Sequence, residues 1–102
     1  MDSEMMKKQV RFLCDQILIL RQLNNKYPNT LNHAEIVSIL NYVKNPEKYA
    51  WSIEGSMIST GLILPSIKNG TIEFTITDCG KYILDKLNNN GTQHYPCPFE
   101  LG

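Results

Sequence analysis

Apolar positions between Ser3 and Lys26 recur at helical spacing, and this segment contains neither proline nor glycine. Steps of four and three residues place one apolar row on a single helix face, and this row is Met6, Val10, Leu13, Ile17 and Leu20. A second row beside it is Phe12, Ile19 and Leu23. The pattern predicts a helix over 3–26 that ends at Tyr27-Pro28, because proline disfavours helical backbone in the residue before it.

The apolar stripe on this predicted helix is wide for so small a protein. One interpretation is a core helix that the rest of the chain wraps. The other is that the second row forms a seam with a second copy of the chain, since heptad-like spacing suits helix-to-helix packing. The two interpretations have equal support, so the candidate residues for a homodimer interface are Phe12, Ile19, Leu23 and, from the last predicted helix, Tyr82.

Capping signals predict two further helices. Asn32 followed by Glu35 has the spacing of an N-cap residue with a reciprocal acid, and the buried face of this second helix is expected at Ile36, Ile39, Leu40 and Val43. Asn45-Pro46-Glu47 combines a cap residue, a proline at the first helical position and an acid near the positive end of the helix dipole. The third helix is therefore expected over 46–60, with Gly61 as its left-handed exit.

After Gly61 the apolar period changes from helical spacing to two. Residues 62–68 and 71–77 are expected as strands of a hairpin, because Asn69-Gly70 between them is a strong turn signal. Pro65 indicates a sheet edge or the start of a strand, and excludes the centre of a sheet. A fourth helix is expected from Thr77 or Asp78, with Ile83, Leu84 and Leu87 directed inward.

The order of these elements predicts an α+β fold that is mostly helical, with a hairpin too small to stand alone. This is the winged-helix arrangement: three helices, a β-hairpin wing and a C-terminal helix. The chain has 102 residues, enough for a single core. We expect one domain over residues 1–90, beginning with a long helix, and a mobile tail over 91–102.

Charge and composition narrow the possible partners. Ten basic and ten acidic side chains leave a formal net charge of zero, which removes overall basicity as an argument for nucleic acid. No apolar stretch approaches the roughly 18 residues of a membrane-spanning helix, and no signal core follows Met1. Three scattered cysteines suggest reduced thiols, with Cys14 in the core. These features predict a cytoplasmic, intracellular protein with no membrane partner.

The sequence contains no pattern of residues that is typical of an enzyme active site. No nucleophile stands beside a base, no pair of carboxylates suggests a cleft, and no glycine-rich phosphate loop follows a strand. His94 and Cys97 lie three residues apart without a second ligand pair, whereas a zinc site needs about four ligands. We therefore expect no enzyme, no catalytic residue, no cofactor and no metal site.

Two segments resemble winged-helix transcription regulators of the MarR and PadR type. The first is Ser59-Thr60-Gly61-Leu62-Ile63, and the second runs from Phe74 to Leu84 and contains Thr77 and Gly80. Regulators of this type commonly end the third helix in a Gly-Leu-Ile step and leave the wing through a Leu-Thr-x-x-Gly turn, where this chain has Ile76 in place of the leucine. The resemblance covers about residues 31–87 and concerns the fold more than the activity, since both motifs have structural roles.

The resemblance implies that residues 46–60 form a recognition helix in the major groove of double-stranded DNA, and that the 62–77 hairpin is a wing whose tip meets the backbone. The implied DNA-binding residues are Lys44, Asn45, Lys48, Trp51, Ser52, Lys68 and Asn69. The protein would be a small homodimeric regulator, repressor-like, whose two recognition helices address half-sites about one helical turn apart.

Other features favour a winged-helix module that binds protein in a larger assembly through the same face. The third helix lacks arginine and carries Glu47 and Glu54, which phosphate would repel unless they turn away. Trp51 is interpreted either as a partly buried core edge or as an interface anchor. The first helix adds the cations Lys7, Lys8, Arg11, Arg21 and Lys26, which are interpreted mainly as a solvated face, with some of them in reach of a DNA backbone.

Overall fold

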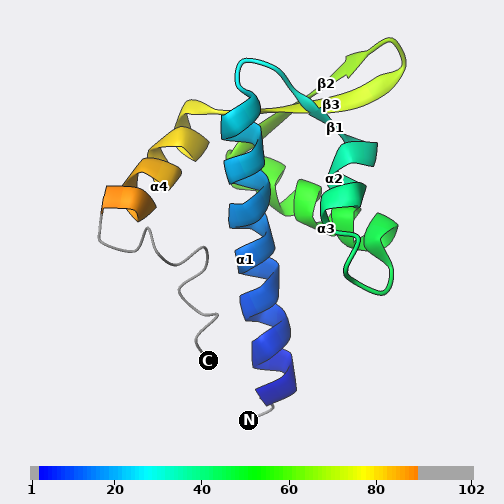
Figure 1. Ribbon diagram of the computed structural model, residues 1–102, viewed down its shortest axis with the longest axis vertical. Helices are drawn as coiled ribbons and strands as arrows, with labels where there is room; N and C mark the ends of the chain where they lie inside the picture. The colour runs from blue at the N-terminus through cyan, green and yellow to red at the C-terminus, as the bar shows by residue number, and fades with distance from the viewer. Residues whose placement is uncertain (1–2, 90–102) are drawn as a thin grey trace.

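The computed structural model describes residues 3–89, which form four helices and a three-stranded antiparallel sheet (Figure 1). In chain order the elements are α1 (Ser3–Lys26), β1 (Leu31–Asn32), α2 (His33–Ile39), α3 (Pro46–Ser59), β2 (Ile63–Lys68), β3 (Thr71–Ile76) and α4 (Asp78–Asn89). The predicted class, α+β and mostly helical, is confirmed. The tail predicted over 91–102 lies outside the described residues.

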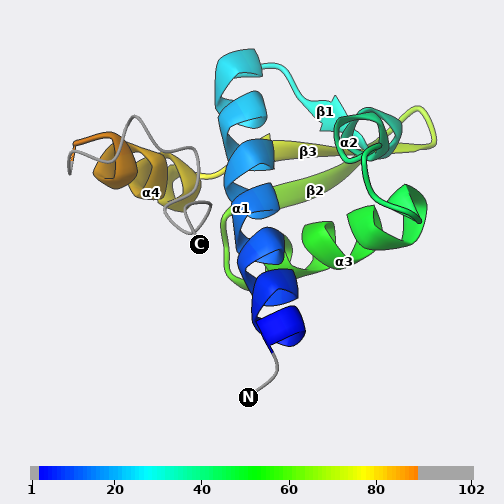
Figure 2. The same ribbon diagram turned by 60° about the horizontal axis from the view of Figure 1, so that its bottom comes forward.

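Helix α1 lies at the centre of the fold, with α4 on one side and α2, α3 and the sheet on the other (Figures 1 and 2). Ile19 and Leu23, which were candidates for a dimer seam, are 0% exposed within a single chain. They pack in the core with Phe74 and Ile53, so neither has surface to offer a second copy. The core interpretation of the second apolar row therefore applies to these two residues, while Phe12 lies half-buried at the edge of the core.

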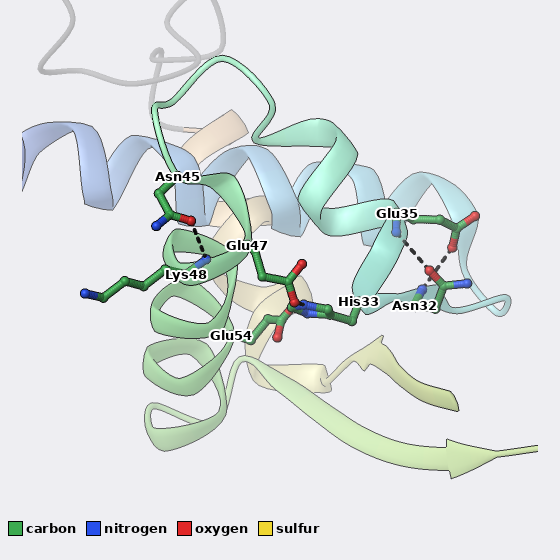
Figure 3. Close-up of polar contacts among 7 residues, drawn as sticks. All are labelled: Asn32, His33, Glu35, Asn45, Glu47, Lys48 and Glu54. Carbon is green, nitrogen blue, oxygen red and sulfur yellow. Dashed lines mark hydrogen bonds and ion pairs between the residues drawn. The ribbon is translucent and has the colours of Figure 1, made fainter. Parts of the chain in front are cut away.

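The helix starts follow the capping residues in the sequence. The Asn32 side chain accepts from the Glu35 amide at 2.8 Å, and the Glu35 carboxylate accepts from the Asn32 amide at 2.9 Å, which completes a capping box (Figure 3). Asn45 caps α3, and Pro46 occupies its first turn. Helix α2 ends at Ile39, which is earlier than the predicted buried position at Val43.

The hairpin has the predicted turn. Asn69 and Gly70 have φ angles of 54° and 78°, the left-handed backbone that a two-residue turn between twisted strands needs. The sheet order is β1-β3-β2, so β2 is an edge strand, in agreement with Pro65. Strand β1 was not predicted, because two residues carry no periodicity; it exists through the pairing of Leu31 with Phe74 on β3.

Helix α4 meets the end of the hairpin at a close backbone contact. The Thr77 hydroxyl donates to the Gly61 carbonyl at 2.6 Å and accepts from the Gly80 amide at 3.0 Å, which caps the helix. A Cβ atom at Gly80 would lie 2.6 Å from the carbonyl oxygen of Leu62 and 2.8 Å from Ile76. The expected role of Gly80, close passage of a neighbouring backbone, is thus confirmed.

The cysteines differ from the expectation of reduced thiols. Cys14 is half-buried on α1 and is disulfide-bonded, so the expectation is wrong for this residue. Cys79 is exposed and free. No helix within residues 3–89 combines the length and the apolar character needed to cross a bilayer.

Replacement of Gly80 by alanine is expected to lower the free energy of unfolding by about 1–3 kcal/mol, because backbone must move to admit the new methyl group. The matched control is Gly55→Ala, also within a helix, where nothing lies within 4 Å of the added Cβ. That variant is expected to be more stable by about 0.5–1 kcal/mol. Urea unfolding of both variants measures the difference, and equal stabilities would contradict the close contact.

Candidate nucleic-acid interface

Helix α3 separates into a buried and an outer face. Ala50, Ile53, Glu54 and Met57 are buried, and their helical spacing directs Lys48 and Ser52 away from the core. Both of these residues are exposed, and Figure 3 shows the Lys48 side chain extending away from the protein. Trp51 is 48% exposed, so it is neither a core residue nor fully free.

A groove runs beside this outer face. Its walls are the N-terminal half of α1 on one side, and the α2–α3 loop with the first two turns of α3 on the other. The lining residues include four cations, one acid and several apolar or aromatic side chains; the charged ones are Lys7, Lys8, Arg11, Lys48 and Glu4. Three predicted DNA-binding residues, Asn45, Lys48 and Ser52, therefore line one concave surface.

Two tyrosines, Tyr49 of α3 and Tyr42 of the α2–α3 loop, fix these segments against α1. The carboxylate of Asp15, which is buried on α1, accepts hydrogen bonds from the hydroxyls of Tyr42 and Tyr49. Burial and the Asp15 carboxylate raise the pKa of Tyr42 to about 12, and the same causes raise the pKa of Tyr49. Both hydroxyls therefore stay protonated near neutral pH. The ring of Phe12 meets Tyr49 edge-on, with centroids 6.1 Å apart.

The two acids of α3 are held by His33, the first residue of α2 (Figure 3). The Nδ1 atom of His33 lies 2.7 Å from the Glu54 carboxylate, and its Nε2 atom lies 2.9 Å from the Glu47 carboxylate. An ionised carboxylate only accepts hydrogen bonds, so both contacts are satisfied when the imidazole carries two protons. Glu54 is 2% exposed and points inward. Glu47 forms its ion pair with His33 at the side of α3.

The pKa shifts of this cluster follow from burial and from its charges. Burial alone would lower the pKa of His33, but the contacts with Glu47 and Glu54 outweigh it and raise the pKa above the ordinary 6.5. Burial raises the pKa of Glu54, and the contact with His33 opposes this only in part. One oxygen of Glu54, Oε1, is buried and has no hydrogen-bond partner among the described residues. The cluster therefore favours the protonated imidazolium.

Trp51 covers the same cluster. Its ring stacks on the imidazole of His33, with centroids 3.8 Å apart and an interplanar angle of 20°. This stack holds the indole at the α2 side of the outer face of α3. The residue is 48% exposed, so part of the indole remains available for contact.

The remaining predicted DNA-binding residues lie apart from the groove. Lys68 and Asn69 are exposed at the β2–β3 turn, and both ribbon views show this turn separated from the start of α3 (Figures 1 and 2). Lys44 is exposed in the α2–α3 loop and does not line the groove. Tyr82, the last candidate interface residue, is 59% exposed on α4.

Sequence reasoning missed the roles of His33 and Asp15. A signal for the first was present: Glu54 shares the inward spacing of Ala50, Ile53 and Met57, and an acid in an apolar register requires a buried partner. The partner could not be identified, because His33 lies 21 residues away in the chain. Asp15 carries the same kind of signal, an acid within the buried stretch of α1.

Comparisons with protein-family models, curated proteins and solved structures find no match to this chain. Among the described residues, no three side chains of His, Cys, Asp or Glu gather as a group that could hold a metal ion. The functional argument therefore depends on the geometry of α3 and the groove beside it.

The stability of the protein is expected to depend on pH through His33. Because folding raises the pKa of His33, its stabilising contribution is complete below about pH 6.5 and is lost as the pH rises through the raised value. The stability advantage of the wild type over His33→Gln should therefore shrink between about pH 5.5 and about pH 8.5. The loss should be about 1.4 kcal/mol for each unit by which the pKa is raised.

Urea unfolding of both proteins at the two pH values measures this difference. An advantage that is constant with pH, or that grows as the pH rises, would show that the carboxylates do not hold a proton on His33.

Proposed function

We propose that this chain is a DNA-binding protein of the winged-helix type, a small transcription regulator of the MarR and PadR kind that acts as a homodimer. In this proposal α3 is the recognition helix, and the β2–β3 hairpin is the wing. Bound to a promoter, it would act as a repressor by excluding polymerase.

The connectivity supports this proposal. Helices α2 and α3 are consecutive and joined by a short loop, and the hairpin follows α3 directly. β1 precedes α2 and pairs with β3, so the sheet that carries the hairpin also anchors the start of α2. This arrangement projects α3 and the hairpin turn to the same side of α1, away from α4 (Figures 1 and 2). A duplex approaching from that side would meet both.

The observation that carries the proposal is the charge on the outer face of α3. The two acids that would repel phosphate are engaged: Glu54 is buried, and the Glu47 side chain, which is 63% exposed, is paired with His33 at 2.9 Å. The outer face is left with Lys48 and Ser52, a cation for phosphate and a hydroxyl for backbone or base contacts. The formal neutrality of the whole chain therefore does not describe this surface.

The homodimer of the proposal uses side chains that remain exposed after folding. Leu13 on α1 is 44% exposed, and Tyr82 on α4 is also open. Both helices are the terminal elements of the described chain, the place where regulators of this type commonly pair. Two copies joined there would each present α3, which suits a palindromic site.

A second candidate function, a module that binds protein, is favoured by one observation. Strand β2 exposes apolar side chains at the sheet edge, with Ile67 71% exposed and Leu64 59% exposed. Apolar groups in such positions are typical of protein contacts. This function needs neither Lys48 nor low salt, and the following experiment separates it from DNA binding.

Fluorescence anisotropy of a labelled mixed-sequence duplex is expected to report binding that weakens steeply between about 50 and about 200 mM salt, through release of counterions. Lys48→Glu should reduce the affinity by about tenfold or more and lower the salt dependence by about one phosphate contact. The control is Lys26→Glu, the same change of charge at the exposed C-terminal end of α1, which does not line the groove.

Equal affinities of the two variants would exclude α3 as the contact surface. Absence of binding at low salt by a folded protein would favour the protein-binding module.

The dimer is tested by two substitutions on α1. Leu13→Glu changes an exposed residue and is expected to give a folded monomer. Ile19→Glu places a charge in the core and is expected to unfold the chain, with a loss above about 4 kcal/mol. Light scattering measures the mass, and circular dichroism measures the fold. A monomeric wild type, or a Leu13→Glu dimer as stable as the wild type, would contradict the seam.

A further inference from the structure

We infer that the phosphate backbone of the bound DNA continues from the outer face of α3 into the groove beside it, where Lys7 and Lys8 of α1 contact it. This inference rests on the proposed function and extends it, because it assigns to α1 a part of the DNA-binding surface. The sequence had favoured a solvated face for these cations, and the groove changes that interpretation.

The lining of the groove includes apolar side chains, among them Met5 and Phe12, and its charged side chains favour an anion. Four of its lining residues are cations, namely Lys7, Lys8, Arg11 and Lys48, and Glu4 is the one acid among them. The start of α3, which carries the positive end of its dipole, also opens into the groove through Asn45 and Lys48. Cation side chains on both walls suit a chain of phosphates that passes between them.

The groove and the outer face of α3 form one continuous surface. Lys48 and Ser52 are exposed on that face and also line the groove. A strand that meets these two residues therefore passes directly to the wall that α1 forms. The position of this wall is fixed, because Asp15 on α1 holds Tyr49 of α3 and Tyr42 of the connecting loop.

The number of phosphates supports this path. Three lysines are predicted to contact DNA, namely Lys44, Lys48 and Lys68. Three phosphate contacts give a plot of log K against log salt a slope of about −3. The two lysines of α1 that contact the backbone in this inference, Lys7 and Lys8, bring the total to five and the slope to about −4.5. A single copy would then approach the range of strong duplex binders.

The test compares two double variants that remove the same charge. Lys7→Gln/Lys8→Gln neutralises the groove, and Lys26→Gln/Lys86→Gln neutralises two exposed cations that do not line it. Arg11 is left unchanged because its guanidinium lies over the Tyr42 ring, 5.2 Å from the centroid, and supports the loop. Circular dichroism confirms that both variants fold, and light scattering that both keep the wild-type mass.

Duplex anisotropy titrations between about 50 and about 200 mM salt then give the slope for each protein. The slope of log K against log salt should be less steep by about two in the groove variant. Raising the salt over this range should therefore weaken its affinity by about tenfold less than it weakens the affinity of the wild type. The control variant should keep the wild-type slope. The same slope in both variants, with the wild type binding DNA, would overturn the groove path and leave the proposed function standing.

Two further outcomes concern the occupant of the groove. A folded wild type that binds no duplex at low salt would overturn the proposed function, and the inference with it. Binding of poly-glutamate that depends on Lys7 and Lys8, without duplex binding, would assign the groove to an acidic protein segment and overturn the path for DNA.

Discussion

Burial of one side of α1 holds the described chain together. Ile19, Leu20 and Leu23 lie fully inside the core, and complete burial of such side chains contributes about 1.5–3 kcal/mol each. Elements α3, β3 and α4 all pack on this helix. Because α1 is long, its N-terminal half extends past the core and forms one wall of a groove. The same helix thus provides both the centre of the fold and part of a surface.

Local signals in the sequence predicted most of the secondary structure, because the forces that start and stop these elements act over a few residues. The capping pair of Asn32 and Glu35 and the Asn69-Gly70 turn are of this kind. Strand β1 was missed because it depends on Phe74, which is distant in the chain. The same limit applied to the second row of α1: periodicity showed that these positions are apolar, but only the packing of α4 and the sheet decides which of them are enclosed.

The candidate site was predictable in part for the same reason. Helical geometry alone places Lys48 and Ser52 on the outer face of α3, and the structure agrees. Helical geometry could not reveal that the two acids of this helix are held by His33, since that contact joins separate elements. The groove was also hidden from the sequence, because its two walls come from segments more than 30 residues apart. Net charge was a poor guide, since four cations and one acid line the groove although the whole chain is formally neutral.

The edge strand β2 carries a consequence for self-association. Unpaired strand edges with apolar side chains invite further strands, which leads to aggregates. Strand β2 has such an edge, with Leu64 and Ile67 open to solvent. Pro65 lies between them and has no amide proton, so a ladder of hydrogen bonds along this edge is interrupted near its middle. Proline here keeps an apolar edge available for contact while it protects the protein from growing into a larger sheet.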